Sequence, residues 1–420
     1  MRNLSLILLL AILGGCLPSC RPQRAPSPPP TASPPTAAAA RGADAELSHL
    51  GQIAFTSDRS RTGQAYLTNP GASMGQVCLM NADGSGVRKL AEIAGCPVFR
   101  DLEWSPDGRE LMFVPVERSP LASAGICVVN ADGGGLRTIV SGRRPDVANQ
   151  SDTHWSPDAS RICFIGVDPK NEGQRDHSPP RMQAGIFVVN RDGTGLRAVV
   201  PVRGGRDCYS PSWSPDGARL AFIENRLPQP GGRPTCAIAV VNVDGSGHAV
   251  LWKLPPDWSR VKGAVARWSP DDAHLAYSSA MDAGEGARCI SLITIVPHSK
   301  PTVQPVPTGD VHQEYWWKWS PDGKSIAYVK ASQQQGPLCL LEIASGQIRD
   351  LTPSASGVSQ FLTWSPDGTH IAFTRVATAA ERGIYAIRAD GSGVTSLTRV
   401  QSLFPPLLAW RPLRRGSGPR

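Results

Sequence analysis

Short apolar runs recur along most of the chain, and each is flanked by residues that favour tight turns. Runs of about five residues, with apolar or aromatic residues at their second to fourth positions, occupy positions 110–114, 161–165, 219–223, 274–278, 325–329 and 370–374. A seventh run, at 52–56, opens the series. Runs of this length and composition predict β-strands rather than amphipathic helices.

One turn motif precedes six of these runs. The sequence Trp-Ser-Pro-Asp begins at Trp104, Trp155, Trp213, Trp268, Trp319 and Trp364, and a shortened copy begins at Trp410. Successive tryptophans are 51, 58, 55, 51, 45 and 46 residues apart, which is close to the period of propeller blades and of some helical repeats. Ser-Pro-Asp-Gly favours a type I turn, because proline fixes φ at the second corner.

A second strand and a second turn complete each repeat. Further strands are predicted at 126–130, 186–190, 237–242 and 384–388, and Asn-x-Asp-Gly-x-Gly turns occur at 81–86, 130–135, 190–195 and 242–247. Short strands such as 87–90 and 196–200 follow these turns. Four strands per period, joined by tight turns, predict an antiparallel blade and exclude a helix pair.

The repeats therefore predict an all-β fold, a β-propeller of seven four-stranded blades. The run at 52–56 has no inner strand before it, and residues 407–412 can supply that strand from the end of the chain. Pairing of the N- and C-terminal strands would close the ring and remove exposed sheet edges. A six-bladed ring is the alternative if one irregular unit lies outside it.

These motifs resemble the repeats of TolB-like β-propellers, which also occur in tricorn-type and dipeptidyl-peptidase-type propellers. The resemblance covers residues 51–412. It implies the fold but leaves the function open, because propellers host many activities. TolB proteins themselves are periplasmic and carry an N-terminal α/β domain before a six-bladed ring. A Pro/Ala-rich segment precedes the first blade here, so the resemblance is to the repeats and not to TolB itself.

The N-terminus has the pattern of an export signal. A basic start is followed by the apolar run 4–13, which is too short for a permanent membrane span. Leu13-Gly14-Gly15-Cys16 resembles the bacterial lipobox, which implies cleavage before Cys16 and a diacylglycerol on its thiol. An ordinary secretory signal is the alternative. We predict a lipoprotein signal peptide at 1–15, a Pro/Ala/Ser-rich tether at 16–47, a propeller at 48–412 and a disordered tail at 413–420.

Charge and location limit the choice of partners. Lys and Arg number 43 and Asp and Glu 35, so the net charge is +8, without any block of like charges. A nucleic-acid partner would require a concentrated basic stripe, and none is predicted. We predict an exported protein that is anchored by its lipid to the bacterial cell envelope. Its partners would then be the membrane and an envelope protein, peptide or glycan.

The sequence predicts no catalytic residue, metal site or cofactor. The eight histidines are scattered, and no cysteine pair has the CxxC spacing of a zinc site. Oligogalacturonate lyases have TolB-like propellers and bind a metal through several histidines, so a histidine cluster assembled only in space stays open as an alternative. Cys236 and Cys289, in successive blades, are a candidate disulfide pair.

The predicted ligand site is the mouth of the central channel. Segments that enter the inner strands differ between blades, whereas the turns repeat; a shared mouth of differing residues can build a site. The candidates are Arg100, Asp101, Asp152, Tyr209, Glu314, Tyr315 and Trp316. A carboxylate beside aromatic rings suits a peptide or sugar face, although packing between blades is the alternative for Trp316. We therefore predict a non-catalytic binding propeller, with a propeller enzyme such as a glycan lyase, or a structural envelope component, as alternatives.

Overall fold

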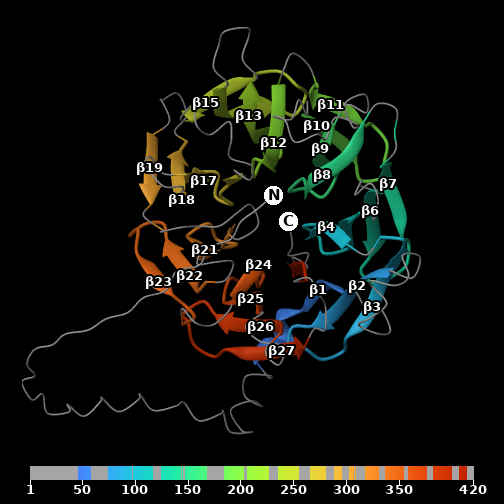
Figure 1. Cartoon of the computed structure of the whole chain (residues 1–420), viewed down its shortest axis with the longest axis vertical. Coiled ribbons are helices and arrows are strands. Elements are labelled where there is room, and N and C mark those ends of the chain that lie inside the picture. Colours follow the sequence, from blue (N-terminus) through green and yellow to red (C-terminus); the bar gives the residue numbers. More distant parts are fainter. Residues whose placement is uncertain are drawn as a thin grey trace, which may run out of the picture.

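The computed structural model forms a ring of β-sheets around a central axis (Figure 1). It describes residues 46–57, 74–96, 98–116, 124–142, 144, 147–167, 184–202, 206–226, 235–254, 265–280, 288–295, 302–306, 308, 317–330, 336–353, 358–375, 382–399 and 406–413. Within these ranges the chain forms seven antiparallel sheets of four strands each. The predicted all-β propeller of seven four-stranded blades is confirmed, and the six-bladed alternative is excluded.

Every blade runs from an inner strand at the axis to an outer strand at the rim. The inner strands are β28 (Leu408–Trp410), β4 (Val98–Trp104), β8 (Ala148–Trp155), β12 (Arg206–Trp213), β16 (Ala266–Trp268), β20 (Trp317–Trp319) and β24 (Val358–Trp364). The second strands are β1 (Gln52–Ser57), β5 (Glu110–Val116), β9 (Arg161–Val167), β13 (Arg219–Arg226), β17 (His274–Ala280), β21 (Ser325–Val329) and β25 (His370–Arg375). These second strands begin at or next to the residues predicted from the apolar runs.

The outer half of each blade carries the second repeated turn. The third strands are β2 (Met74–Asn81), β6 (Gly125–Asn130), β10 (Ala184–Asn190), β14 (Thr235–Asn242), β18 (Arg288–Thr294), β22 (Leu338–Glu342) and β26 (Gly383–Arg388). The outer strands are β3 (Arg88–Ala94), β7 (Arg137–Ser141), β11 (Arg197–Val200), β15 (Ala249–Leu254), β19 (Thr302–Val306), β23 (Ile348–Asp350) and β27 (Thr395–Arg399). A short 3-10 helix, η1 (Ser48–Leu50), precedes the first blade.

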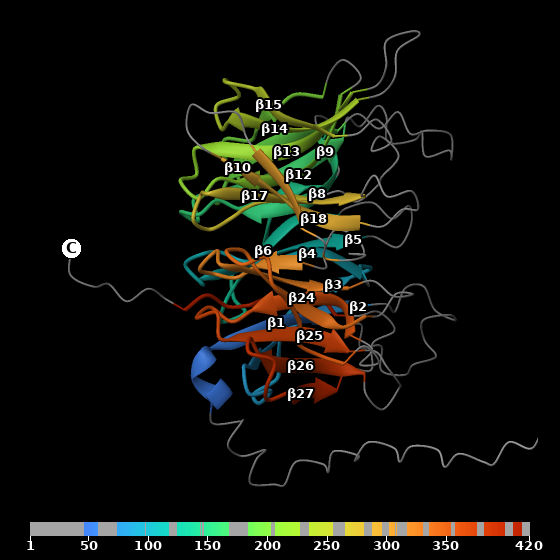
Figure 2. The ribbon, with the colours of Figure 1, turned by 90° about the vertical axis from the view of Figure 1, so that its left-hand side faces the viewer.

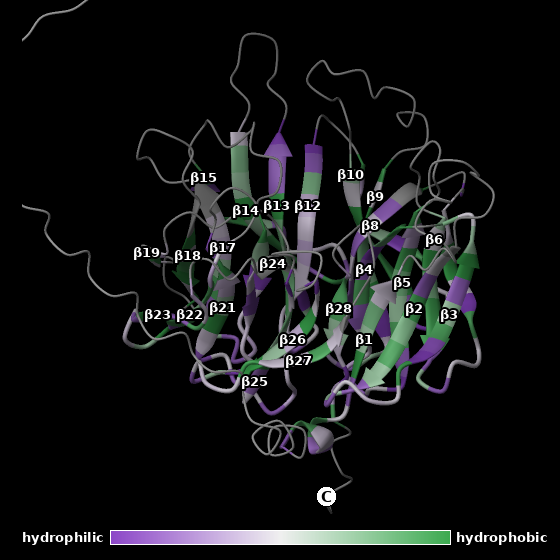
Figure 3. Ribbon diagram, turned by 60° about the horizontal axis from the view of Figure 1, so that its bottom comes forward, coloured by the Kyte–Doolittle hydropathy of each residue, from purple (hydrophilic) through white to green (hydrophobic). Residues whose placement is uncertain are grey.

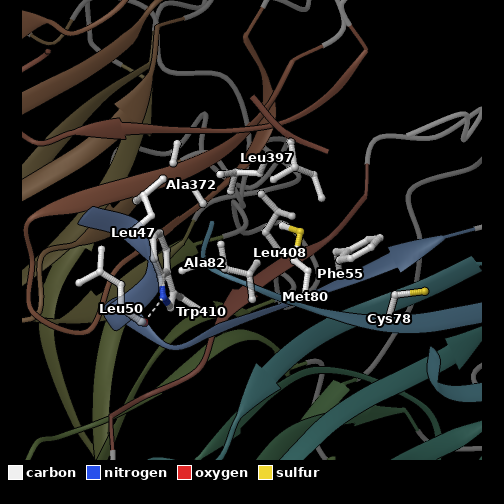
Figure 4. Close-up of a cluster of buried hydrophobic side chains, with 13 residues drawn as sticks. Leu47, Leu50, Phe55, Cys78, Met80, Ala82, Ala372, Leu397, Leu408 and Trp410 are labelled. Atoms are coloured by element: carbon white, nitrogen blue, oxygen red, sulfur yellow. Dashed lines mark hydrogen bonds between the residues drawn. The ribbon is translucent and has the colours of Figure 1, made fainter. Parts of the chain in front are cut away.

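The two ends of the folded chain meet in one blade, as the sequence predicts. Strand β28 pairs antiparallel with β1, and Ile53 lies opposite Trp410. The indole Nε1 of Trp410 donates a hydrogen bond of 2.7 Å to the carbonyl oxygen of Leu50 in η1 (Figure 4). Leu47 and Leu50 are buried in the same cluster as Trp410. The C-terminal strand therefore supplies the inner strand of the first blade.

The hydrophobic core lies between the blades. Seven large clusters of buried side chains each combine residues of two neighbouring blades. Leu79 of the first blade, for example, packs with Trp104 and Phe113 of the second. The strands β2, β5 and β28 are correspondingly hydrophobic over most of their length (Figure 3). Each blade is thus stabilised mainly by its contacts with its neighbours.

The repeated tryptophans also link neighbouring blades through their indole N–H groups. Nε1 of Trp213 donates to the carbonyl oxygen of His154 at 3.1 Å, and Nε1 of Trp364 donates to that of Lys318 at 3.2 Å. Trp104 and Trp319 make the equivalent bonds to Ala409 and Arg267. In all four cases the acceptor directly precedes the tryptophan of the previous blade, so the bond fixes the height of that residue along the axis.

The Ser-Pro-Asp turns have the predicted type I hydrogen bond. In the first copy the backbone N–H of Gly108 donates to the carbonyl oxygen of Ser105 at 2.7 Å, and the Asp107 carboxylate accepts from the Ser105 hydroxyl at 2.6 Å. Gly108 has a φ of +64°, which favours glycine. Ala159 and Asp272 occupy the same position with φ near +60°, so two copies keep the turn without glycine.

The ring has two different faces. The turn face carries the turns between first and second strands, such as 105–109, and those between third and fourth strands, such as 131–136. The entrance face is the opposite one, where the inner strands begin. Helix η1 leads into β1 on the turn face (Figure 2). No helix within the described residues is long and apolar enough to cross a membrane.

Candidate functional site

One residue of each repeat lies at an equivalent place around the axis, namely the residue directly before the repeated tryptophan. Glu103 of β4 pairs with Met112 of β5, and Arg267 of β16 pairs in the same way with Ala276 of β17. The residues at this position are Glu103, His154, Ser212, Arg267, Lys318, Thr363 and Ala409. We call them the pre-tryptophan ring. Because inner strands surround the axis (Figure 1), the ring brings side chains from all seven blades to one level.

The second and third blades are joined within this ring by a carboxylate and an imidazole. Oε2 of Glu103 lies 2.8 Å from Nδ1 of His154. Burial lowers the pKa of His154, and the nearby Arg267 guanidinium lowers it further. The imidazole is therefore neutral at neutral pH, and its Nδ1–H donates to Glu103. Among the described residues, Nε2 of His154 has no hydrogen-bond partner, so this nitrogen is left as an acceptor.

The fifth and sixth blades contribute two cations. Nη1 of Arg267 donates to the Ser210 hydroxyl and, at 3.1 Å, to the carbonyl oxygen of Ala266. Burial lowers the pKa of Lys318, and the positive charge of Arg267 lowers it further. Within the described part of the chain, neither cation forms a salt bridge with a carboxylate. The ring is therefore acidic on one side and basic on the other.

The predicted residues Asp101 and Asp152 lie two positions before ring members, toward the entrance face. Both have a φ of +50°, and Ser210, at the same position of β12, has a φ of +54°. The inner strands have register shifts here. The bulges let each side chain reach the next blade, where Asp101 accepts from the Thr153 backbone N–H at 3.1 Å and Asp152 accepts from that of Ser210 at 3.2 Å.

Asp152 is close enough to influence the ionisation of Asp101. Burial raises the pKa of Asp101, and the Asp152 carboxylate raises it further, to about 7. A carboxyl group with such a pKa is partly protonated at neutral pH. The structure thus brings together two of the predicted site residues, and Asp101 carries only part of a negative charge at neutral pH.

The predicted residue Tyr209 takes part in packing and in a local hydrogen bond. Its ring packs against Ile165 and Val167 of the preceding blade, and its hydroxyl donates to Asp207. Burial raises the pKa of Asp207 to about 6, although the bond from Tyr209 opposes this shift. Arg100 is half-buried next to Asp101 and lowers the pKa of that carboxyl. Tyr209 is therefore engaged by the fold, while Arg100 moderates the charge of the aspartate pair.

A cavity of about 380 Å³ opens beside the pre-tryptophan ring on the turn face. Its wall contains Glu103, His154, Ser212 and Arg267 from the ring, together with tryptophans and prolines of three Ser-Pro turns. Ser212 belongs to the pre-tryptophan ring, and its hydroxyl oxygen accepts a hydrogen bond of 3.1 Å from the Trp268 backbone N–H. The hydroxyl proton of Ser212 is therefore free to be donated to another acceptor. This cavity lies at the opposite end of the axis from the predicted mouth.

A second cavity, of about 530 Å³, lies on the turn face away from the axis and is rich in arginine. Arg191 bonds Glu110 at 2.7 Å and Asp107 at 2.8 Å. Arg411 donates to Gly108 and to Gln52. These arginines join neighbouring blades, so we interpret this groove as structural.

Several predicted features fall outside the described residues. Glu314, Tyr315 and Trp316 of the predicted mouth are among them, as is the lipidation residue Cys16. These four residues stay predictions. Among the residues that the structure does describe, no group of three or more His, Cys, Asp or Glu side chains could hold a metal ion. Cys236 is a buried free thiol, so the candidate disulfide with Cys289 is not formed.

Comparison with known proteins gives partial matches. No protein-family model matches the chain. An uncharacterized protein of Agrobacterium fabrum is 29% identical over 189 residues, which cover 45% of this chain and 57% of that protein. The Tol-Pal system protein TolB of Alcanivorax borkumensis is 41% identical over 56 residues, 13% of each chain. The chain therefore spans at most about half of the length of these curated relatives.

Solved structures agree on the fold. The oligogalacturonate lyase of Vibrio parahaemolyticus matches with a TM-score of 0.53 at 15% identity, covering 72% of this chain and 82% of that one. The sequence repeats, the seven-bladed ring and the match to TolB all indicate the same type of fold. The chain is a TolB-like β-propeller. The match to TolB is confined to 56 residues, so this TolB-like propeller is not TolB itself.

Sequence reasoning missed the ring of the TolB-like propeller. The prediction assigned functional weight to the segments that enter the inner strands, and it did not consider the residue directly before each tryptophan. A signal was present, however, because glutamate, histidine, arginine and lysine occupy this one position in four repeats whose neighbouring tryptophan never changes. A charged residue that varies beside a fixed aromatic residue could have identified the position.

Proposed function

We propose that the protein is an exported, lipid-anchored propeller of the bacterial cell envelope that binds a protein, peptide or glycan without catalysing a reaction. The observation that supports binding is the mixed charge of the pre-tryptophan ring. Glu103, Arg267 and Lys318 come from three blades of an otherwise repeated scaffold and lie at one level around the axis. Groups of both signs around a cavity suit a polar ligand that is oriented by its charges.

The envelope location rests on the N-terminal sequence and on the place where the chain enters the ring. The lipobox-like segment ends at Cys16, and residues 16–47 form the proposed tether. Helix η1 receives this segment on the turn face (Figure 2). A Pro-rich tether of 32 residues spans about 100 Å when extended. Such a length would hold the propeller near a membrane while leaving both faces accessible.

Replacement of Cys16 tests the anchor. We expect Cys16→Ser to move the protein from the membrane fraction to the soluble fraction, because serine cannot form the thioether that carries the lipid. Mass spectrometry of the wild-type N-terminus should show a diacylglycerol on Cys16. The matched control is Cys20→Ser, which lies in the same segment and should stay with the membrane. Membrane retention of the Cys16 variant would contradict the lipid anchor.

Replacement of two predicted mouth residues tests the binding site. We expect Tyr315→Ala combined with Trp316→Ala to weaken retention of the envelope partner by about tenfold, because tyrosine and tryptophan are enriched among the residues that dominate binding energy. The measurement is quantitative recovery from separated protein and glycan fractions of the envelope. Trp252→Ala is the control, since this outer-strand tryptophan is 36% exposed. Equal recovery by a folded double variant would place the site elsewhere.

One observation favours a second candidate, a propeller enzyme such as a glycan lyase. His154 is neutral, is oriented by Glu103 and leaves Nε2 unbonded among the described residues, which is the arrangement of a general base. The lyase of Vibrio parahaemolyticus has the same type of fold. Incubation with oligogalacturonate, followed by detection of the unsaturated product by its ultraviolet absorbance, separates the two candidates. Product that is lost in His154→Ala would establish the enzyme.

A further inference from the structure

Two like charges occupy equivalent positions in the ring. Neither is bonded to a carboxylate within the described residues, although Glu103 and Asp101 favour the charged form of Lys318. Arg267 and Lys318 occupy the same position on the neighbouring strands β16 and β20, and the charge of Arg267 lowers the pKa of Lys318. Within the described residues, the Lys318 ammonium makes neither a hydrogen bond nor a salt bridge. Adjacent cations in a partly enclosed place repel each other. An anion between them would relieve this repulsion.

The opposite side of the ring presents acceptors. The Glu103 carboxylate receives one bond from His154, and carboxylates can accept several. Nε2 of His154 is an acceptor without a partner among the described residues. The Asp101 and Asp152 pair lies two residues closer to the entrance face and adds negative charge there. This side therefore suits a cation that can donate several hydrogen bonds, such as an ammonium group.

The cavity limits the size of the ligand. Its volume of about 380 Å³ lies near the lower end of the range for small-molecule pockets. Indoles and prolines of the Ser-Pro turns form the remaining wall, and these offer apolar contact to a short side chain. A monoanion is favoured over a phosphate, because Glu103 lies in the same wall and would repel a second negative charge.

We propose that the turn-face end of the axis binds a zwitterionic amino-acid head group, presented by a free amino acid or a short peptide. Arg267 in the cavity wall binds its carboxylate, and Lys318 at the equivalent position of the next blade adds positive charge. Glu103 and Nε2 of His154 accept hydrogen bonds from its ammonium group. This proposal rests on the binding function proposed above and names the ligand class for one end of the ring. It assigns no role to Tyr315 and Trp316.

The test measures binding of small probes to the purified full chain by saturation-transfer NMR and calorimetry. The probes are the dipeptide Ala-Ala, its N-acetylated form, its C-terminal amide, free alanine and galacturonate. We expect Ala-Ala to bind and each blocked form to bind at least tenfold more weakly, since each has lost one of the two charges. Alanine and Ala-Ala together separate a free amino acid from a peptide as the source of the head group.

Variants of the ring complete the test. Lys318→Met should weaken Ala-Ala binding at least tenfold without disturbing the fold, because its side chain makes no described bond. Arg267→Gln should act in the same direction, and Glu103→Gln should weaken Ala-Ala while improving binding of the N-acetylated form. Lys324→Met is the control, since this lysine lies in the turn of the same blade and its side chain is 83% exposed.

Three results would overturn the proposal. These are no binding of any zwitterionic probe, equal binding of free and blocked dipeptides, or full binding by Lys318→Met. Galacturonate binding as tight as that of Ala-Ala would show that a carboxylate alone suffices, which also rejects the zwitterion. If the wild type still retains an envelope partner in these cases, the ligand class fails and the proposed binding function stands. If the wild type binds neither a zwitterionic probe nor an envelope partner, the ligand class and the proposed binding function are both rejected.

Discussion

A chain that ends at Ser402 is expected to lose the cooperative unfolding of the ring, with a free energy of unfolding lower by more than about 5 kcal/mol. The truncation removes β28, and with it the buried side chains of Leu408 and Trp410. It also removes the Ala409 carbonyl oxygen that accepts from Trp104 Nε1 at 3.2 Å. The first blade would then lack its inner strand, and two inter-blade clusters would be opened to water.

Thermal unfolding followed by circular dichroism measures this effect, and hydrogen exchange of residues 52–57 locates it. A chain that ends at Leu413 is the matched control, because it keeps β28 and should unfold like the full chain. Trp410→Ala in the full chain should give a smaller loss of about 3–5 kcal/mol, as for other buried aromatic residues. A melting temperature that the Ser402 truncation leaves unchanged would show that the ring does not depend on closure.

Asp101 is expected to make the wild-type protein less stable as pH rises from about 4 to 7. Burial and the Asp152 carboxylate raise the pKa of Asp101 to about 7 in the folded state, from its ordinary value of 3.8. The folded protein therefore binds more protons than the unfolded chain within this window, so its free energy of unfolding falls with increasing pH. The contribution is fully present below the unfolded pKa and is lost as pH passes the folded pKa.

Asp101→Asn should abolish this dependence, so that the variant gains about 2–4 kcal/mol relative to the wild type between pH 4 and pH 7.5. Asparagine keeps the oxygen that accepts from Thr153 and tolerates the φ of +50°. Urea unfolding at several pH values measures the difference. Asp158→Asn is a control of opposite sign, because hydrogen bonds from Ser156 and Ser160 lower the pKa of Asp158 in spite of its partial burial. Parallel stability curves for Asp101→Asn and the wild type would contradict the prediction.

The scaffold could be predicted from sequence because its determinants are local and repeated. Trp-Ser-Pro-Asp specifies a turn through proline geometry and the side chain of aspartate, and the apolar run that follows fills a strand. The pairing of β28 with β1 followed from counting incomplete units. None of these inferences required a contact between side chains of different blades.

The site could be predicted only in part, because its chemistry arises between blades. Asp101 and Asp152 were selected since they differ from their counterparts. Their left-handed backbone and the raised pKa of Asp101 depend on bulges that no short motif predicts. Tyr209 looked like a contact residue and is held by packing and by Asp207. The opposition of Arg267 and Lys318 to Glu103 depends on which blades are neighbours, and a list of residues does not contain that information.

Closure by β28 also sets the order in which the chain can reach its final form. Strand β1 is among the first to be synthesised, yet its neighbour β28 is among the last, and the bond from Trp410 to Leu50 joins residues 360 positions apart. Until then the first blade exposes an unpaired edge to proteases and to other unfolded chains. Contacts so distant in sequence form slowly. A chaperone that shields the edge of β1 until β28 has been made would therefore raise the yield of this propeller more than one acting on any later blade.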